Sequence, residues 1–487
     1  MTDRPRAAWT FAITSIALFM VALDNLVVTT ALPVIKHDLG ASLSGLEWTV
    51  NAYTLTYAVL LLTGAALGDR YGRRLMFVIG MVIFVAGSAA AALAPSIGAL
   101  VVARAGQGVG GAIVTPLTLT IMSAAMPRER RGLALGAQGG VSGLGVAIGP
   151  LVGGAVVQGL SWQWIFWLNV PIGLALLPLA IIRLTETTGP QRSLDLPGLG
   201  LASGGLFGIV FGLVRGSEHG WTGPGVAGWL IAGSGLLVGF VVRELLAAAP
   251  MVPMRFFRDW PFSGANLTSL LLFFGLFGSV FLLAQFFQIV QGYTPLQAGL
   301  RILPWTAAPI LVAPIAGVLS DRVGARPLLV AGMALMAAGL GWLAAITTPT
   351  VAYLDMVTPF VLAGVGMSLL FAPISNVVLS SVTREEEGKA SGVNNTIREI
   401  GGVFGVAVLA TVFSAAGSYL SPQTFVDGLT AAVWVGAAVV ALGALAALAV
   451  PGRRRPVAPA GRHLHHRRDS GRGPAVTPPN AHNGLDP

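Results

Sequence analysis

Apolar stretches of about 20 residues, each long enough to cross a bilayer, recur along the whole chain between short charged or turn-rich breaks. Hydrophobic residues make up 54% of the 487 residues and charged residues only 10%, which is too apolar for a soluble domain of this size. We therefore expect an all-α integral membrane protein with about fourteen transmembrane helices. Their centres are expected near residues 21, 57, 84, 108, 144, 173, 206, 236, 276, 308, 337, 368, 403 and 438.

The placement of arginines predicts how these helices are oriented. Basic residues cluster in alternate loops, whereas the opposite loops hold little beyond Lys36, Arg215 and Arg301. Because positive charge favours the cytoplasmic side, we expect a multi-pass protein of the plasma membrane, such as the bacterial inner membrane, with both termini in the cytoplasm. The net charge of +9 is then mostly a matter of topology, and nucleic acid is not expected as a partner.

An internal repeat divides the chain. "LGDRYGRR", Leu67 to Arg74, follows the second expected helix, and "LSDRVGAR", Leu319 to Arg326, follows the tenth. Both occupy the same place in a block of six helices, so we expect two six-helix bundles with a helix pair inserted between them. The expected boundaries are 1–190 for the first bundle, 191–250 for the inserted pair, 251–451 for the second bundle, and 452–487 for a basic, proline-rich, disordered cytoplasmic tail.

Four motifs along the chain resemble those of one transporter family. They are "LDNLVVTTALP" in the first helix, "LGDRYGRR" after the second, "RAGQGVGGA" in the fourth and "GAQGGVSGLGVAIGPLVGG" in the fifth. Together they resemble the major facilitator superfamily, and specifically its fourteen-helix drug:proton antiporters. The resemblance implies the major facilitator fold and export by alternating access. The fifth-helix pattern is the most specific, because six positions must be in register: Gly136, Gly145, Gly149, Pro150, Gly153 and Gly154.

These glycines have a physical use. Glycines three and four residues apart make a smooth helix face that another helix can approach closely, and a proline bends the helix. The pattern predicts a moving helix interface, with generic tight packing as the alternative. For the repeated loop motif, the resemblance implies a latch that holds the two bundles in one conformation, and Asp69 could cap or face a helix N-terminus. A plain topology anchor is the alternative. The residues of the expected latch are Asp69, Arg70, Gly72, Arg73, Arg74, Asp321, Arg322 and Arg326.

Asp24 is an acid inside the first apolar stretch. A rise of about 1.5 Å per residue from Trp9 puts Asp24 roughly 22 Å into the membrane. Arg104, counted from Ile97 on a helix of opposite direction, lies roughly 10 Å below the external face, which is a matching depth. We therefore predict a contact between Asp24 and Arg104, direct or through water. Dehydration raises the proton affinity of an aspartate and a nearby arginine lowers it, so this pair is a candidate proton-coupling site. The alternative is a static ion pair between two helices.

A second charged site is expected on the thirteenth helix. Arg398 and Glu399 lie roughly 15 Å from the cytoplasmic face if that helix starts near Gly388. Neighbouring residues on a helix point about 100° apart, so these two need not pair. Glu399 is a candidate second proton site, or else the partner of an arginine. Polar and aromatic residues could together line a broad amphipathic pocket, although each alone could serve helix packing: Asn25, Tyr53, Gln107, Gln285, Gln288, Trp305 and Asn395.

The chain shows no sign of catalysis or of ATP use. "GQGVGG" fits a dinucleotide pattern by its letters only, because it lies inside a membrane helix, and neither lysine completes a P-loop. We therefore expect a non-enzymatic secondary transporter without cofactor or metal, which exports small lipophilic compounds in exchange for protons and needs no oligomer. The alternatives are an exporter of one metabolite or lipid, or a membrane receptor or scaffold that does not transport.

Overall fold

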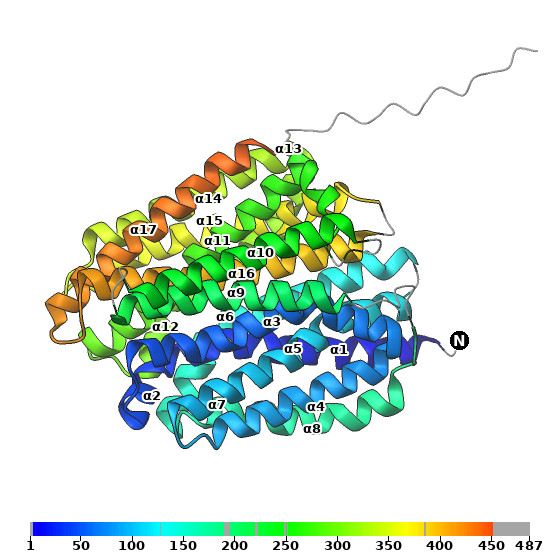
Figure 1. The fold of residues 1–487 in the computed structure, drawn as a ribbon, viewed down its shortest axis with the longest axis horizontal. Coiled ribbons are helices and arrows are strands. Elements are labelled where there is room, and N and C mark those ends of the chain that lie inside the picture. The colour runs from blue at the N-terminus through cyan, green and yellow to red at the C-terminus, as the bar shows by residue number, and fades with distance from the viewer. Residues whose placement is uncertain are drawn as a thin grey trace, which may run out of the picture. The chain divides into compact units, whose positions relative to one another are not determined.

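The computed structural model describes residues 3–126, 128–188, 195–219, 223–247, 250, 252–383 and 386–450. All of the regular structure in these residues is helical (Figure 1). The expected disordered tail, 452–487, lies outside the described residues, so it stays a prediction.

The helices form three groups along the chain. The N-terminal helices are α1 (Asp3–Val27), η1 (Val28–Thr30), α2 (Leu32–Leu39), α3 (Leu43–Tyr71), α4 (Arg73–Ala92), α5 (Ile97–Ala125), α6 (Arg128–Gly159), α7 (Trp164–Trp167) and α8 (Asn169–Arg183). The inserted pair is α9 (Leu196–His219) and α10 (Pro224–Leu246). The C-terminal helices are η2 (Met254–Arg258), α11 (Trp260–Gln285), η3 (Phe286–Val290), α12 (Pro295–Thr306), α13 (Ala308–Val323), α14 (Ala325–Ile346), α15 (Tyr353–Ser380), α16 (Glu387–Ala416) and α17 (Pro422–Leu448).

The described residues contain twelve helices that are long and apolar enough to cross a membrane. The count rises to thirteen when the bent pair Leu43–Leu61 and Thr63–Tyr71 within α3 is taken as one span. The further span expected near residue 144 falls on α6, of which Ile148–Gly159 is a shorter apolar helix. The expected all-α membrane architecture is therefore confirmed, whereas the number fourteen is not.

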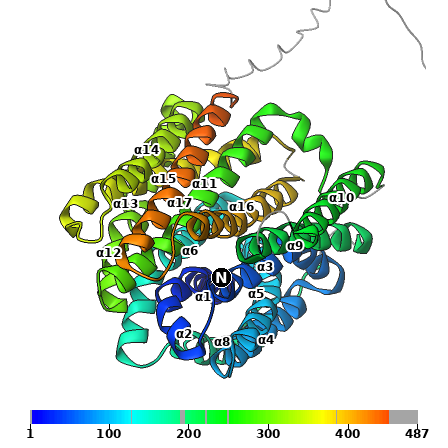
Figure 2. The same ribbon diagram turned by 60° about the vertical axis from the view of Figure 1, so that its left-hand side comes forward.

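The N-terminal and the C-terminal helices are called the two bundles below; they belong to one compact unit, so the expected boundaries between them stay a prediction. In the N-terminal bundle α5 packs against α3 and α4, and α1 packs against α6; in the C-terminal bundle α11 packs against α16 and α17, and α14 against α15. The inserted helices pack against each other, and α9 also contacts α3 and α16 (Figure 2). The two bundles meet where α6 contacts α12 and where α3 contacts α16.

Helix starts with side-chain caps gather at one end of the bundle. Ser42, Ser96, Thr294 and Ser421 each accept a hydrogen bond from the backbone N–H three residues on, at the first turns of α3, α5, α12 and α17. These four helices all start at the end of the bundle where α2 lies, which we call the α2 end. At the opposite end, the internal repeat is visible in the backbone: Gly72 (φ +111°) joins α3 to α4 and Gly324 (φ +89°) joins α13 to α14.

Candidate functional site

Asp24 on α1 and Arg104 on α5 form an ion pair through Oδ2 and Nη1. The contact predicted from their matching depth is therefore confirmed. Both side chains are inaccessible to solvent. A charge in the middle of a membrane helix is costly unless it is paired, and here each side chain of the pair neutralises the other.

The second carboxylate oxygen of Asp24 is held by two amides. Gln107 Nε2 on α5 and Asn169 Nδ2 on α8 both donate to Asp24 Oδ1 at 2.8 Å. The same two nitrogens lie 2.7 and 3.0 Å from the hydroxyl of Ser88 on α4. Asp24 therefore accepts hydrogen bonds from an arginine and two amides.

Arg104 is fixed by further contacts inside the N-terminal bundle. Its Nε donates to the carbonyl of Thr49 at 3.2 Å, and its Nη1 also donates to Gln107 Oε1 at 2.7 Å. The guanidinium carbon lies 4.3 Å from the ring centroid of Tyr53. Nη2 has no hydrogen-bond partner among the described residues. All of these contacts lie within the N-terminal helices, so the pair is enclosed in one bundle.

Neither Ser88 nor Asn169 was expected at the site from the sequence. A signal for Asn169 was present, because it is an amide within the apolar segment "WQWIFWLNVPIG". Ser88 carried no such signal, because a serine in a membrane helix can donate its hydroxyl hydrogen to a backbone carbonyl of the same helix. A single serine therefore does not indicate a site.

Glu399 on α16 lies where the two bundles meet. Its carboxylate interacts with the side chain of Asn25 on α1, and Tyr57 on α3 is close enough to interact with it electrostatically. The Tyr57 ring stacks on Tyr53 with centroids 5.9 Å apart, and Tyr53 in turn lies under Arg104. The two acids, Asp24 and Glu399, are thus connected through adjacent residues of α1 and through two stacked tyrosines of α3.

The proposed pocket residues do not gather around one cavity in this conformation. Tyr53 donates from its hydroxyl to the carbonyl of Val21, and Trp305 stacks on Phe360 with centroids 6.2 Å apart. Four of the seven, Tyr53, Gln107, Gln285 and Trp305, are almost completely inaccessible. The other three make polar contacts: Asn25 with Glu399, Gln288 with the carbonyl of Thr30 at 2.9 Å, and Asn395 with Arg398 at 3.2 Å. Their role in a pocket stays a prediction.

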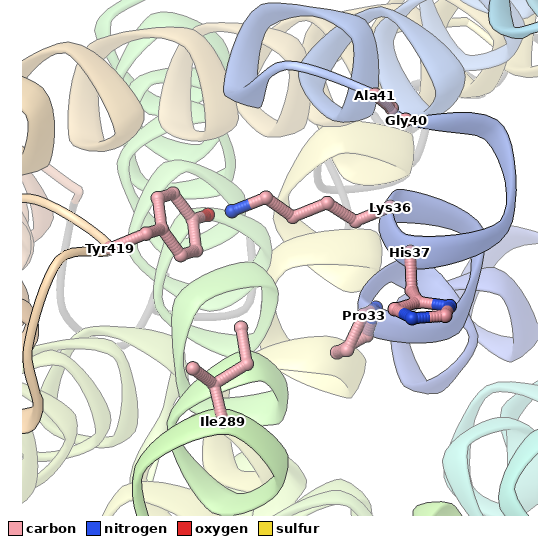
Figure 3. Close-up of a pocket in the computed structure, with 7 residues that line it drawn as sticks. All are labelled: Pro33, Lys36, His37, Gly40, Ala41, Ile289 and Tyr419. Carbon is pink, nitrogen blue, oxygen red and sulfur yellow. The ribbon is translucent and has the colours of Figure 1, made fainter.

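An open hollow of about 420 Å³ lies at the α2 end, between α2 and the loop that follows α16 (Figure 3). Lys36 reaches across it, and its Nζ lies 3.0 Å from the ring centroid of Tyr419. The Tyr419 hydroxyl donates to Gln285 Oε1 on α11 at 2.6 Å. Burial lowers the pKa of Lys36, and burial together with the nearby Glu47 raises the pKa of Tyr419. This contact joins the two bundles at their α2 ends, and it was not expected from the sequence.

The loop motif "LGDRYGRR" makes its polar contacts near the ends of α3, α4 and α8. Arg73 donates from Nε and Nη2 to Asp69 Oδ1 at 3.1 and 2.9 Å. Glu186 caps α4, because its carboxylate accepts from the backbone N–H groups of Arg74 and Leu75 at 3.0 and 3.1 Å. The carboxylate that caps α4 is therefore Glu186, which was not expected from the sequence, whereas Asp69 binds Arg73.

The remaining residues of the expected latch are placed as follows. Arg70 is exposed and lies over the ring of Tyr71, 5.1 Å from its centroid. In the second copy, Arg322 and Arg326 are exposed, and the side chain of Asp321 lies outside the described part of the chain. The contacts described above join parts of the N-terminal bundle, so a latch between the bundles stays a prediction.

The glycines of α6 face two different helices. A Cβ atom on Gly145 or Gly153 would lie 2.9 or 2.4 Å from the carbonyl oxygens of Phe19 and Val27 on α1. On Gly149 it would meet Leu26 Cβ of α1 at 3.1 Å.

The next glycine turns to the other bundle. A Cβ atom on Gly154 would lie 2.3 Å from the carbonyl oxygen of Pro295 on α12, and one on Gly299 of α12 would lie 2.2 Å from that of Pro150. The glycine pattern thus lets α6 lie in backbone contact with both bundles. Gly136 is outside the part of α6 with described side chains.

Comparison with known proteins identifies the family. The model of the major facilitator superfamily matches residues 14–406, with a second match over 290–474. The chain belongs to the major facilitator superfamily. Members of this superfamily are transporters and not enzymes, so the expectation of a non-enzymatic membrane protein is confirmed.

Within the major facilitator superfamily, several relatives are named for drug or antibiotic export. The chain is 34% identical to the tetracenomycin C resistance and export protein of Streptomyces glaucescens, over 82% of this chain and 75% of that protein. It is 36% identical to the multidrug resistance protein Stp of Mycobacterium tuberculosis, over 83% and 76%. It is 38% identical to the cephamycin export protein CmcT of Amycolatopsis lactamdurans, over 81% and 83%. The resemblance inferred from the motifs is therefore confirmed.

Solved major facilitator structures agree with the fold. A bacterial homologue of the human lysosomal transporter Spinster, in an inward-facing and unoccupied conformation, aligns with a TM-score of 0.65 at 16% identity, over 92% of this chain and 97% of that one. The xylose transporter XylE of E. coli aligns with a TM-score of 0.59 at 14% identity, over 91% and 97%. At these identities the similarity supports the fold alone.

Proposed function

We propose that this major facilitator protein exports small lipophilic or amphipathic drug-like compounds in exchange for protons, by alternating access. The observation that carries the proposal is the Asp24–Arg104 pair, a solvent-inaccessible ion pair inside a transmembrane bundle. Relatives named for tetracenomycin C resistance and export and for cephamycin export support the direction, and these together with a relative named for multidrug resistance support the class of cargo.

The contacts of Asp24 couple its protonation state to the position of Arg104 and so to the helices α1 and α5. Arg104, Gln107 and Asn169 all donate to Asp24. In the proposed cycle, a proton on Asp24 removes its charge and with it the attraction to Arg104, and loss of the proton restores that attraction. A shift of α1 relative to α5 would accompany each event.

Glu399 is the proposed second proton site. It belongs to α16 of the C-terminal bundle but interacts with Asn25 of α1 in the N-terminal bundle. A neutral carboxyl and a charged one differ in their attraction to the guanidinium of Arg398 and in the hydrogen bonds they make. The charge state of Glu399 would therefore affect how firmly the two bundles hold together.

Energy for export is available from the proton gradient. One elementary charge crossing about 100 mV releases about 2.3 kcal/mol, and each pH unit adds about 1.4 kcal/mol. One proton per cycle would support a cargo gradient of several hundredfold. The proposal includes α6 as the fourteenth span, both termini on the cytoplasmic side of the plasma membrane, and the charged loop motifs as a latch between the bundles.

The test uses inverted membrane vesicles with an established pH gradient. Adding a transported drug should discharge the gradient in vesicles with the wild-type protein, and Asp24→Asn should abolish the response. Asp427→Asn is the matched control, because it removes an exposed acid on α17 and should respond like wild type. A wild-type response from Asp24→Asn would refute the proton role of Asp24.

A narrow exporter of one compound is the second candidate, because the tetracenomycin C and cephamycin relatives are each named for a single compound or compound group. A panel of chemically diverse toxic compounds separates the two candidates. Protection of cells against several unrelated compounds supports the multidrug proposal, and protection against one structural class supports the narrow exporter.

A further inference from the structure

The open hollow at the α2 end is large enough for a small molecule, and both bundles line it (Figure 3). Its volume of about 420 Å³ lies within the range of small-molecule pockets, about 300–1,000 Å³. The lining residues are Pro33, Lys36, His37, Gly40 and Ala41 from the N-terminal bundle, and Ile289 and Tyr419 from the C-terminal bundle. This lining includes none of the residues expected at the proton sites or in the cargo pocket, so the hollow is a separate place.

Lys36 brings a positive charge to this hollow. Its Nζ lies 3.0 Å from the ring centroid of Tyr419, and among the described residues the ammonium forms no hydrogen bond and no ion pair. A cation–π contact stabilises the charge through the face of the ring, but the N–H groups that point away from the ring have no acceptor there. Lys36 can therefore still donate hydrogen bonds to an anion in the hollow.

The two acids near the hollow do not line it. Glu47, which interacts electrostatically with Tyr419, is inaccessible to solvent. Asp38 accepts a hydrogen bond from Trp162 Nε1 at 3.1 Å and lies beside the exposed ring of His37. The described side chains that line the hollow are therefore neutral or cationic, which suits an anionic ligand.

The other walls of the hollow are apolar and aromatic. Pro33 and Ile289 contribute aliphatic surface, and Tyr419 contributes its ring. The Tyr419 hydroxyl donates to Gln285 Oε1 at 2.6 Å, so this hydrogen bond fixes the ring. A ligand that fills the hollow therefore needs an apolar body beside its charge.

We propose that this hollow binds a small organic acid with an aromatic body, whose carboxylate pairs with Lys36. The aromatic body packs against Pro33, Ile289 and Tyr419. Because the walls belong to both bundles, the bound acid contacts both and favours the arrangement in which their α2 ends are together. This site is additional to the proposed exchange of cargo for protons.

An anionic lipid headgroup could offer the same kind of charged oxygen. Lys36 lies beyond Thr30, where the first span ends, so it is near the level of the headgroups. The bilayer composition is therefore part of the test, with phosphatidylcholine as the neutral lipid and phosphatidylglycerol as the anionic one.

The test follows the reactivity of Lys36 itself. Lys36 and Lys389 are the only lysines of the chain, so mass spectrometry can follow acetylation by N-acetoxysuccinimide at each. The full-length protein is held in phosphatidylcholine nanodiscs, and the ligands are 1-naphthaleneacetate and its uncharged amide. The concentration that halves the rate at Lys36 should be about threefold or more lower for the carboxylate than for the amide, as expected for a partly buried ion pair. Lys389, at the start of α16, is the internal control and should react equally in all samples.

A variant tests the aromatic wall. Tyr419→Leu should raise the half-protecting concentration of the carboxylate about threefold or more, because the ring is lost. Tyr353→Leu is the matched control, since Tyr353 lies over Arg301 and does not line the hollow, and it should behave like wild type.

Four results would overturn the proposal. They are equal protection of Lys36 by the carboxylate and the amide, no protection by either, equal protection of Lys389, and an unchanged half-protecting concentration in Tyr419→Leu. Slower acetylation of Lys36 relative to Lys389 in phosphatidylglycerol nanodiscs without added ligand would identify a lipid headgroup as the occupant, and it would also overturn the proposal.

Discussion

Replacement of Gly154 by alanine tests whether the contact between α6 and α12 closes the α2 end. A Cβ at this position would lie 2.3 Å from the carbonyl oxygen of Pro295 and 2.7 Å from Leu296 Cα, whereas ordinary contact begins at 3.4 Å. Both neighbours are backbone atoms, so the helices themselves must separate by about 1 Å. Overpacking of this kind costs about 1–3 kcal/mol, and only the closed conformation bears that cost. The ratio of closed to open molecules should therefore fall about 5- to 150-fold.

The absence of cysteine from the natural chain makes the measurement direct. A single cysteine introduced by Ala41→Cys reports on opening, because Ala41 is only 6% exposed and lies beside Lys36 and Tyr419, which join the two bundles at the α2 end. When opening is fast compared with chemical modification, the rate of maleimide labelling follows the population of the open form. Gly154→Ala should raise that rate at least fivefold.

Gly159→Ala is the matched control. Gly159 is the last residue of the same helix and has nothing within 4 Å of its Cβ position, so alanine adds a methyl group there without a new contact. Its labelling rate should equal that of the parent protein. Equal rates for Gly154→Ala and Gly159→Ala would show that the α6–α12 contact does not hold the α2 end closed.

Three further predictions follow from the other contacts. Asp24→Asn leaves Arg104 without its counterion in a solvent-inaccessible site, so we expect a loss of about 3–5 kcal/mol in unfolding free energy, measured by denaturation in detergent; a loss below 1 kcal/mol would contradict the pairing. Glu186→Gln should lower stability by about 1 kcal/mol, because a charged cap at the start of α4 becomes neutral, whereas Asp427→Asn, at an exposed acid of α17, should leave the thermal melt close to that of wild type. Burial lowers the pKa of Lys36 in the folded protein below the ordinary value of 10.5, so its charged form destabilises the folded state at lower pH. This destabilisation disappears as the pH rises from the lowered pKa toward 10.5, because the folded protein then carries a neutral amine. The melting temperature of wild type should therefore rise relative to Lys36→Met across this alkaline range, and parallel curves would refute the reasoning.

The features of the fold that depend on composition and repetition could be predicted from the sequence. Long apolar runs can only be membrane helices, and the repeated loop motif marks the two equivalent joints at Gly72 and Gly324. The number of spans is not confirmed, because the described apolar stretch of α6, Ile148–Gly159, is too short to cross a bilayer by itself, although the whole helix contains 32 residues.

For the candidate site, depth was predictable and neighbours were not. The rise per residue of a helix is constant, so it placed Asp24 and Arg104 at one level and their contact followed. Which side chains complete the site depends on how the helices are rotated about their axes. Asn169 and Ser88 come from helices whose facing sides the sequence does not define, and Glu186 reaches α4 only through tertiary structure.

The two-sided glycine contacts of α6 also limit how the protein can move. A side chain between two helices can change its rotamer and so absorb a small displacement, but a backbone carbonyl against a backbone has no such freedom. When α1 shifts by a few tenths of an ångström, α6 has to follow, and its contact at Gly154 passes the shift to α12. A change of charge at Asp24 would therefore be felt on the far side of α6 as a movement of whole helices.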